Sequence, residues 1–129
     1  MHFTRLLWVP VGLILLLSAA PAAAQISLVT PNVPVTEDFD TLANSGTGSV
    51  VPSGWAFAES GSNANTTYSA GTGSGTGGDT YSFGAAAATD RAFGGLLSGS
   101  LTPTIGAAFQ NNTGLTLESL DIAYTGEQW

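Results

Sequence analysis

The stretch GWAFAE, residues 54–59, carries the pattern on which the fold of this chain depends. Its large side chains alternate with glycine and alanine, and this period of two is typical of a β-strand with one buried face. The stretch DTYSF, residues 79–83, alternates in the same way. Turn-forming Gly, Ser and Pro residues flank both stretches. We therefore expect two strands, whose core side chains are Trp55, Phe57, Tyr81 and Phe83.

Short strand-like stretches continue on both sides of these two. They are VTEDFDTL (35–42), DRAFG (90–94), LTPTIGAAFQ (101–110) and LTLESLDIAY (115–124). The turn NNTG (111–114) joins the last two as partner strands, and the Gly/Ser/Thr-rich residues 61–78 are interpreted as a long inter-strand loop. No stretch after the N-terminal region shows a helical period. About six or seven short strands predict an all-β, antiparallel, jelly-roll-like β-sandwich that is incomplete.

The N-terminus predicts a secretory signal peptide over residues 1–24. Arg5 supplies a positive charge, residues 6–19 are apolar, and small alanines favour cleavage after Ala24. The apolar run is shorter than a membrane span, so we expect no membrane insertion after cleavage. An uncleaved N-terminal anchor is the alternative.

The mature chain is expected to be one module. Residues 25–34 predict an extended N-terminal segment, and residues 35–129 predict the β-sandwich. The chain has no cysteine, which fits a bacterial secreted or cell-surface protein better than a disulfide-stapled animal module. Since a strand pattern runs almost to Trp129, we expect a C-terminally truncated module. The alternative is a tail that folds back and buries Trp129.

Charge and composition exclude most catalytic chemistry. His2 and Arg5 leave with the signal peptide, so the net charge of −7 becomes −8 and Arg91 remains the only basic residue. Without His, Lys or Cys, the mature chain cannot build a Ser-His-Asp triad, a Schiff base or a His-based zinc site. Its negative charge repels phosphates, so we expect no nucleic-acid partner. We predict that the chain is not an enzyme.

Several segments together point to a known kind of module. They are EDFDTL, VPSGWAF, SNANTTYSAGTG, GDTYSFG, RAFGGLLSGSLTPTIGAAFQNNTG and LDIAYTGEQW. Over residues 35–129 they resemble the N-terminal jelly-roll-like module of secreted bacterial surface and extracellular proteins. This adhesin-like module also stands ahead of extracellular nuclease or anchor regions. The resemblance implies a β-sandwich without catalytic residues.

Two functions follow as expectations from this resemblance. The first is a secreted, non-catalytic module for adhesion, glycan contact or surface display, with glycans or cell-surface components as partners. The alternative is an accessory N-terminal domain of a longer extracellular hydrolase or nuclease whose catalytic region is absent from this chain. A matrix or surface-layer component is a third interpretation. The oligomeric state is left open.

Acidic and aromatic residues give the candidate sites. Calcium prefers several carboxylate and carbonyl oxygens as ligands. We therefore predict a structural calcium site formed by Glu37 or Asp40 with help from Asp79 or a loop carbonyl. Solvated acids on an edge strand are the alternative. Aromatic faces suit sugar rings, and Tyr68 is expected to be the most exposed ligand-binding aromatic residue.

The remaining glutamates offer weaker candidates. A glycosidase needs two carboxylates as an acid/base pair, and these could come from Glu59, Glu118 and Glu127. Nothing in the sequence selects two of the three. Glu127 could instead bond Arg91, the only basic partner in the mature chain.

Overall fold

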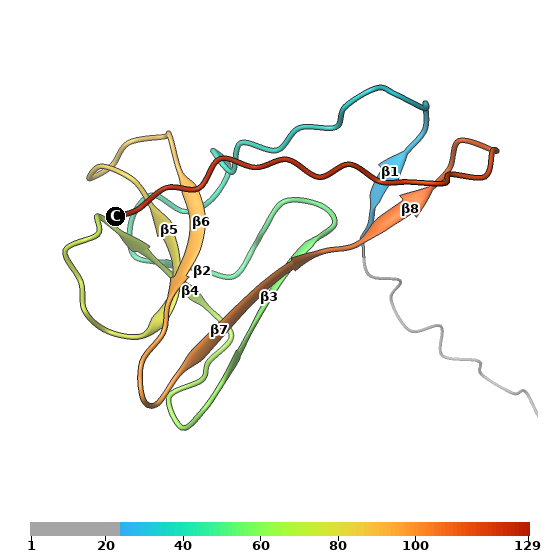
Figure 1. Ribbon diagram of the computed structural model, residues 1–129. Helices are drawn as coiled ribbons and strands as arrows, with labels where there is room; N and C mark the ends of the chain where they lie inside the picture. Colours follow the sequence, from blue (N-terminus) through green and yellow to red (C-terminus); the bar gives the residue numbers. More distant parts are fainter. Residues whose placement is uncertain (1–23) are drawn as a thin grey trace, which may run out of the picture.

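The computed structural model describes residues 24–129, and nearly all of the predicted signal peptide lies outside these described residues. Figure 1 shows short strands joined by long loops. The strands are β1 (Ile26–Leu28), β2 (Thr47–Gly48), β3 (Trp55–Ser60), β4 (Tyr68–Gly71), β5 (Asp79–Phe83), β6 (Ala92–Leu96), β7 (Thr102–Ala107) and β8 (Phe109–Asn111). Within residues 24–129 no helix is long and apolar enough to cross a membrane. The predicted all-β class is confirmed.

The strands form three sheets. Four strands pair in the order β2-β4-β5-β6, while β3 pairs with β7 and β1 pairs with β8. The β3–β7 ribbon packs against the four-stranded sheet through contacts of β3 with β5 and of β7 with β6 (Figure 1). This arrangement of several sheets is consistent with a β-sandwich. The expectation of a purely antiparallel sandwich is wrong, because β4–β5 and β1–β8 are parallel pairs.

The predicted first strand over residues 35–42 is wrong. The Glu37 carboxylate accepts the Phe39 backbone N–H at 2.9 Å, and the Asp38 carboxylate accepts the Asp40 N–H at 3.0 Å. Such local side-chain bonds compete with a sheet ladder. They hold a bend in which Phe39 adopts a positive φ of 63°, and this bend places its ring against the core.

The predicted partner strand over residues 115–124 is also wrong. β7 pairs along its whole length with β3. The Asn111 side chain accepts the Thr113 N–H at 3.1 Å, and Gly114 has a φ of +73°. The turn therefore forms, but the chain leaves it as an irregular segment that runs back towards β5 (Figure 1).

The other strand predictions hold with shifted bounds. The strand expected at 90–94 is β6, two residues later, and the one expected at 101–110 is divided into β7 and β8. The predicted loop over 61–78 contains β4, which pairs with β2 and β5. The many small residues around β4 make it resemble a loop in the sequence. The neighbouring strand β2 needs a glycine at position 48, because a Cβ on Gly48 would lie 2.5 Å from the Tyr68 ring of β4.

Five aromatic rings form an inner aromatic cluster between the β3–β7 ribbon and the four-stranded sheet. The Phe39 and Trp55 ring centroids lie 4.7 Å apart, and Phe93 lies 5.9 Å from Tyr68. Edge-to-face pairs such as these each contribute ~0.5–1.5 kcal/mol beyond burial. Trp55 and Phe57, both half-buried, thus pack in this cluster as expected, whereas Tyr81 and Phe83, which the sequence also predicts for the core, stack separately with Trp129. The full cluster is Phe39, Trp55, Phe57, Tyr68 and Phe93.

Candidate functional site

Strand β5 has an unusual distribution of polar and aromatic residues. Thr80 and Ser82 are completely buried on its inner face. Tyr81 and Phe83 are only half-buried, and they lie on the opposite face because successive side chains of a strand alternate. A sheet with one wet face normally buries its aromatic residues and exposes its Thr and Ser. Buried polar groups and exposed apolar patches are the informative exceptions to this rule, so both faces of β5 call for an explanation.

The inner face of β5 binds a buried arginine. Arg91 is 3% exposed. Its Nε donates to the Ser82 hydroxyl at 2.9 Å, its Nη1 to the Ala85 carbonyl at 3.1 Å and its Nη2 to the Gly71 carbonyl at 3.3 Å. Nη2 also donates to the Ser82 carbonyl. These bonds tie β4, β5 and the loop after β5 together. Arg91 is therefore structural, and Ser82 is buried because it serves as its acceptor.

The proposed pair of Arg91 with Glu127 is wrong. The partners of the Arg91 guanidinium are neutral oxygens on β4, β5 and the following loop. The Glu127 carboxylate instead accepts the Trp129 indole N–H at 3.1 Å. The backbone N–H of Arg91, not its side chain, meets an acid, because it donates to Asp40 at 3.1 Å.

Glu59 on β3 is the second polar group fixed by the inner face. One oxygen accepts the N–H and the hydroxyl of Thr80, both at 2.8 Å, and the other accepts the Asn65 N–H at 3.0 Å. Desolvation raises the pKa of the Glu59 carboxyl, but these hydrogen bonds together outweigh it and hold the pKa below its ordinary value. Thr80 is thus buried as the hydrogen-bond partner of Glu59.

On the outer face, three aromatic side chains form what we call the outer aromatic row: Tyr81, Phe83 and Trp129. The Tyr81 and Phe83 centroids lie 4.9 Å apart at 27°, and those of Phe83 and Trp129 lie 6.4 Å apart at 8°. Trp129 is 48% exposed. Glycines on the neighbouring strands leave room for the rings, since a Cβ on Gly71 would lie 2.8 Å from Tyr81.

Carboxylates lie at both ends of the outer aromatic row. At one end, Asp79 accepts the Ser69 hydroxyl at 2.6 Å, and burial together with the charge of Asp79 raises the pKa of Tyr81. The Tyr81 hydroxyl donates to the Gly77 carbonyl at 2.9 Å. At the other end, Glu127 accepts the Trp129 indole N–H. The row therefore combines near-parallel rings with hydroxyls and negative charge.

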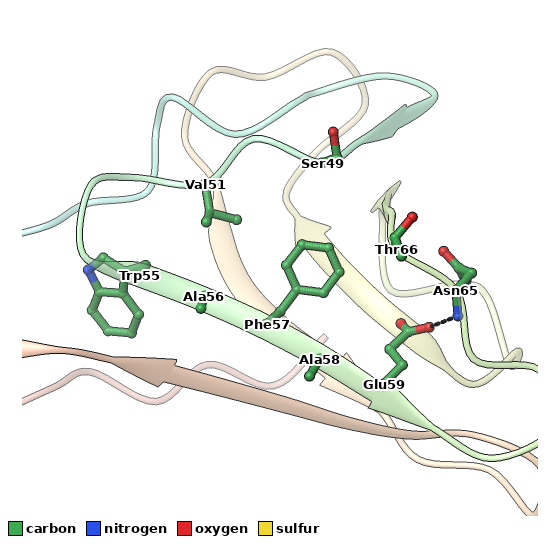
Figure 2. A pocket seen from close by; sticks show the side chains of 9 residues that line it. All are labelled: Ser49, Val51, Trp55, Ala56, Phe57, Ala58, Glu59, Asn65 and Thr66. Carbon is green, nitrogen blue, oxygen red and sulfur yellow. Dashed lines mark hydrogen bonds between the residues drawn. The ribbon is translucent and has the colours of Figure 1, made fainter. Parts of the chain in front are cut away.

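An open hollow of about 480 Å³ borders β3 and is shown in Figure 2. Its floor includes Trp55 and Phe57, and its far end carries Glu59 bonded to Asn65 (Figure 2). Glu59 is the single acid among the residues that line the hollow. The buried Nε1 of Trp55 has no hydrogen-bond partner within the described residues.

Tyr68 is not the exposed residue that the sequence predicts. It is 2% exposed and lies in the inner aromatic cluster. Its hydroxyl donates to the Val50 carbonyl and accepts the Ala43 N–H, both at 3.0 Å. Tyr68 is therefore a structural bridge between β4 and the chain on both sides of β2. The sequence analysis missed Tyr68 because it interpreted the glycine-rich stretch as a loop, whereas Tyr68 begins strand β4 there.

The three acids predicted to bind calcium have separate partners. Glu37 bonds the Phe39 N–H, Asp40 bonds the Arg91 N–H, and Asp79 bonds the Ser69 hydroxyl. Within residues 24–129 no three His, Cys, Asp or Glu side chains gather where one metal ion could bind them all. Calcium binding stays a prediction, which a melting curve in calcium and then in EGTA tests.

The comparisons with known proteins give this chain no family. No protein-family description, curated protein or solved structure matches it. The resemblance to a secreted jelly-roll-like module therefore stays a prediction, and the side chains on the two faces of β5 are the basis for the function proposed below.

Proposed function

We propose that the chain is a secreted, non-catalytic β-sandwich module that contacts glycans through the outer aromatic row, in adhesion or surface display. One observation supports this function above all: β5 buries Thr80 and Ser82 and turns Tyr81 and Phe83 outwards. Partly exposed aromatic surface, as on the half-buried Tyr81 and Phe83 and on Trp129, is a feature of interaction sites. The Ser69 hydroxyl and the Asp79 carboxylate beside the row would bond sugar hydroxyls.

The chemistry of the row suits a sugar better than it suits a nucleic acid. Aromatic rings pack on the C–H faces of sugars, and polar groups at the edge fix the orientation of the ligand. A nucleic acid would also need cations for its phosphates. The one basic residue among the described residues is Arg91, whose guanidinium is buried on the inner face. The row thus supports sugar binding and gives phosphates nothing to pair with.

Binding to a panel of polysaccharides tests the proposal. Phe83→Ala removes the central ring of the row, and Phe109→Ala is the matched control because Phe109 is 38% exposed on β8, outside the row. We expect the protein to bind at least one glycan, Phe83→Ala to weaken that binding at least tenfold, and Phe109→Ala to leave it unchanged. The proposal is overturned if the folded protein binds no glycan or if both variants bind equally well.

A further inference from the structure

We infer that the outer aromatic row selects glycans built from amino sugars with free ammonium groups. This inference rests on the proposed function and names the ligand class of the same site. Asp79 lies at the Tyr81 end of the row and Glu127 at the Trp129 end. Rings flanked by carboxylates are the combination that recognises organic ammonium groups, through cation–π attraction and charge-assisted hydrogen bonds.

Both carboxylates can accept further hydrogen bonds. The Asp79 oxygens accept the Ser69 hydroxyl at 2.6 Å and the Thr80 N–H at 2.9 Å, one bond for each oxygen. One Glu127 oxygen accepts the Trp129 indole N–H. A carboxylate has about four lone-pair positions, so each acid retains acceptor positions for a ligand. Glu127 is exposed, which keeps its charge within reach of a bound chain.

The charge of the surface discriminates among sugars. The described residues contain nine acidic side chains, and the one basic side chain, Arg91, is buried among neutral acceptors. A glycan of uronic acids or sulfated sugars would therefore meet repulsion at both ends of the row. A neutral glycan would gain stacking and hydrogen bonds to its hydroxyls, but no attraction between opposite charges. An amino-sugar glycan gains stacking, cation–π contact with Trp129 and attraction to Asp79 and Glu127.

Three oligosaccharides test this selection by calorimetry at low salt. The first is a glucosamine oligomer with protonated amines, the second is its N-acetylated form of equal length, and the third is a uronic acid oligomer. We expect the glucosamine oligomer to bind roughly tenfold more tightly than the acetylated one. The uronic acid oligomer should not bind. Salt should reduce the tenfold preference, because the charges are exposed and become screened.

Variants that each remove one charge locate the effect. Asp79→Asn and Glu127→Gln should each weaken binding of the glucosamine oligomer more than binding of the acetylated oligomer, and so reduce the preference between the two. Glu118→Gln is the matched control, since Glu118 is an exposed acid outside the row and its substitution removes the same single negative charge. We expect it to keep the preference.

Each other result has a definite meaning. Equal binding of the glucosamine and acetylated oligomers would overturn the amino-sugar selection and leave the proposed glycan contact intact. A preference that falls as much in Glu118→Gln as in Asp79→Asn would also overturn it, because the attraction would then be a general effect of net charge. Failure of all three oligomers and of the wider polysaccharide panel would remove both the selection and the proposed function.

Discussion

The inner and outer faces of β5 differ in how completely their side chains are satisfied. On the inner face, Ser82 and Thr80 are wholly buried, and each is bonded to one long side chain, Arg91 or Glu59. On the outer face, Tyr81 and Phe83 stack with a Trp129 that is 48% exposed. Five consecutive residues thus supply a closed hydrogen-bond network and an open aromatic surface.

This difference separates stability from binding along one strand. A buried polar group left without its partner lowers the free energy of unfolding, and removal of a half-buried or exposed ring lowers it less. We therefore expect substitutions on the inner face to lower stability and substitutions on the outer face to lower ligand binding. The four predictions below test that separation, beginning with the largest expected loss of stability.

Arg91→Met should give the largest loss of stability. The variant keeps a long side chain but leaves the buried Ser82 hydroxyl without the guanidinium donor, and it removes the guanidinium bonds to the Gly71 and Ala85 carbonyls. The fully buried Ser82 hydroxyl left unpaired costs ~1–3 kcal/mol and each of the other lost hydrogen bonds costs ~0.5–1.5 kcal/mol, so we expect a loss of about 3 kcal/mol. Urea unfolding followed by circular dichroism measures it.

Asp90→Asn is the control for this prediction, because it changes the net charge by one unit at the neighbouring exposed position. Its stability should stay within ~0.5 kcal/mol of the unsubstituted protein. If Arg91→Met unfolded at the same urea concentration as Asp90→Asn, the hydrogen bonds of Arg91 on the inner face would not stabilise the fold. The contrast between the two faces of β5 would then be lost.

Tyr68→Phe should have a smaller effect. The ring remains in the inner aromatic cluster, but the Val50 carbonyl loses its donor and the Ala43 N–H loses its acceptor. We expect a loss of about 2 kcal/mol in the free energy of unfolding, with glycan binding unchanged. A variant that keeps its stability but loses binding would return Tyr68 to the binding site that the sequence predicts for it.

Glu59 should make stability depend on pH in the acid range. Its pKa is lowered in the folded chain, so its ionised form stabilises the fold above the unfolded pKa, near 4.5. This contribution is lost as the pH falls from about that value through the lower folded pKa. The melting temperature should therefore decrease as the pH is lowered through this window. In Glu59→Gln that part of the fall should be missing, and an identical pH profile would contradict the assigned hydrogen bonds.

The sequence predicts the parts of this fold in which side-chain alternation dominates. β3 and β5 lie where GWAFAE and DTYSF place them, because their large residues follow the period of a strand. The segment 35–42 has a similar pattern but bends, since Glu37 and Asp38 bond the backbone N–H groups two residues ahead. Such local competition is invisible in a pattern of apolar and polar residues.

The candidate site was predictable only in its residue types. The sequence predicts Tyr81 and Phe83 for the core and Tyr68 for the ligand, because it offers no means of telling the faces of β5 apart. The face is decided by long-range partners: Arg91 binds Ser82, and Glu59 on β3 binds Thr80. Those two bonds bury the small polar residues and turn the rings outwards. Tyr68 was misplaced for the same reason, because its partners Val50 and Ala43 lie far from it in sequence.

Trp129→Ala should have the smallest effect on stability and a large effect on binding. Trp129 contacts Phe83 through near-parallel rings, lies against Gly73 and remains 48% exposed. An aromatic pair contributes ~0.5–1.5 kcal/mol beyond burial, so we expect a loss of about 1 kcal/mol in urea unfolding. Loss of the ring should weaken glycan binding at least tenfold. Trp129→Phe, which keeps an aromatic face, should recover most of that binding. If Trp129→Ala instead unfolds the chain, the ring supports the sheet as Arg91 does, and the outer face belongs to the core rather than to a ligand.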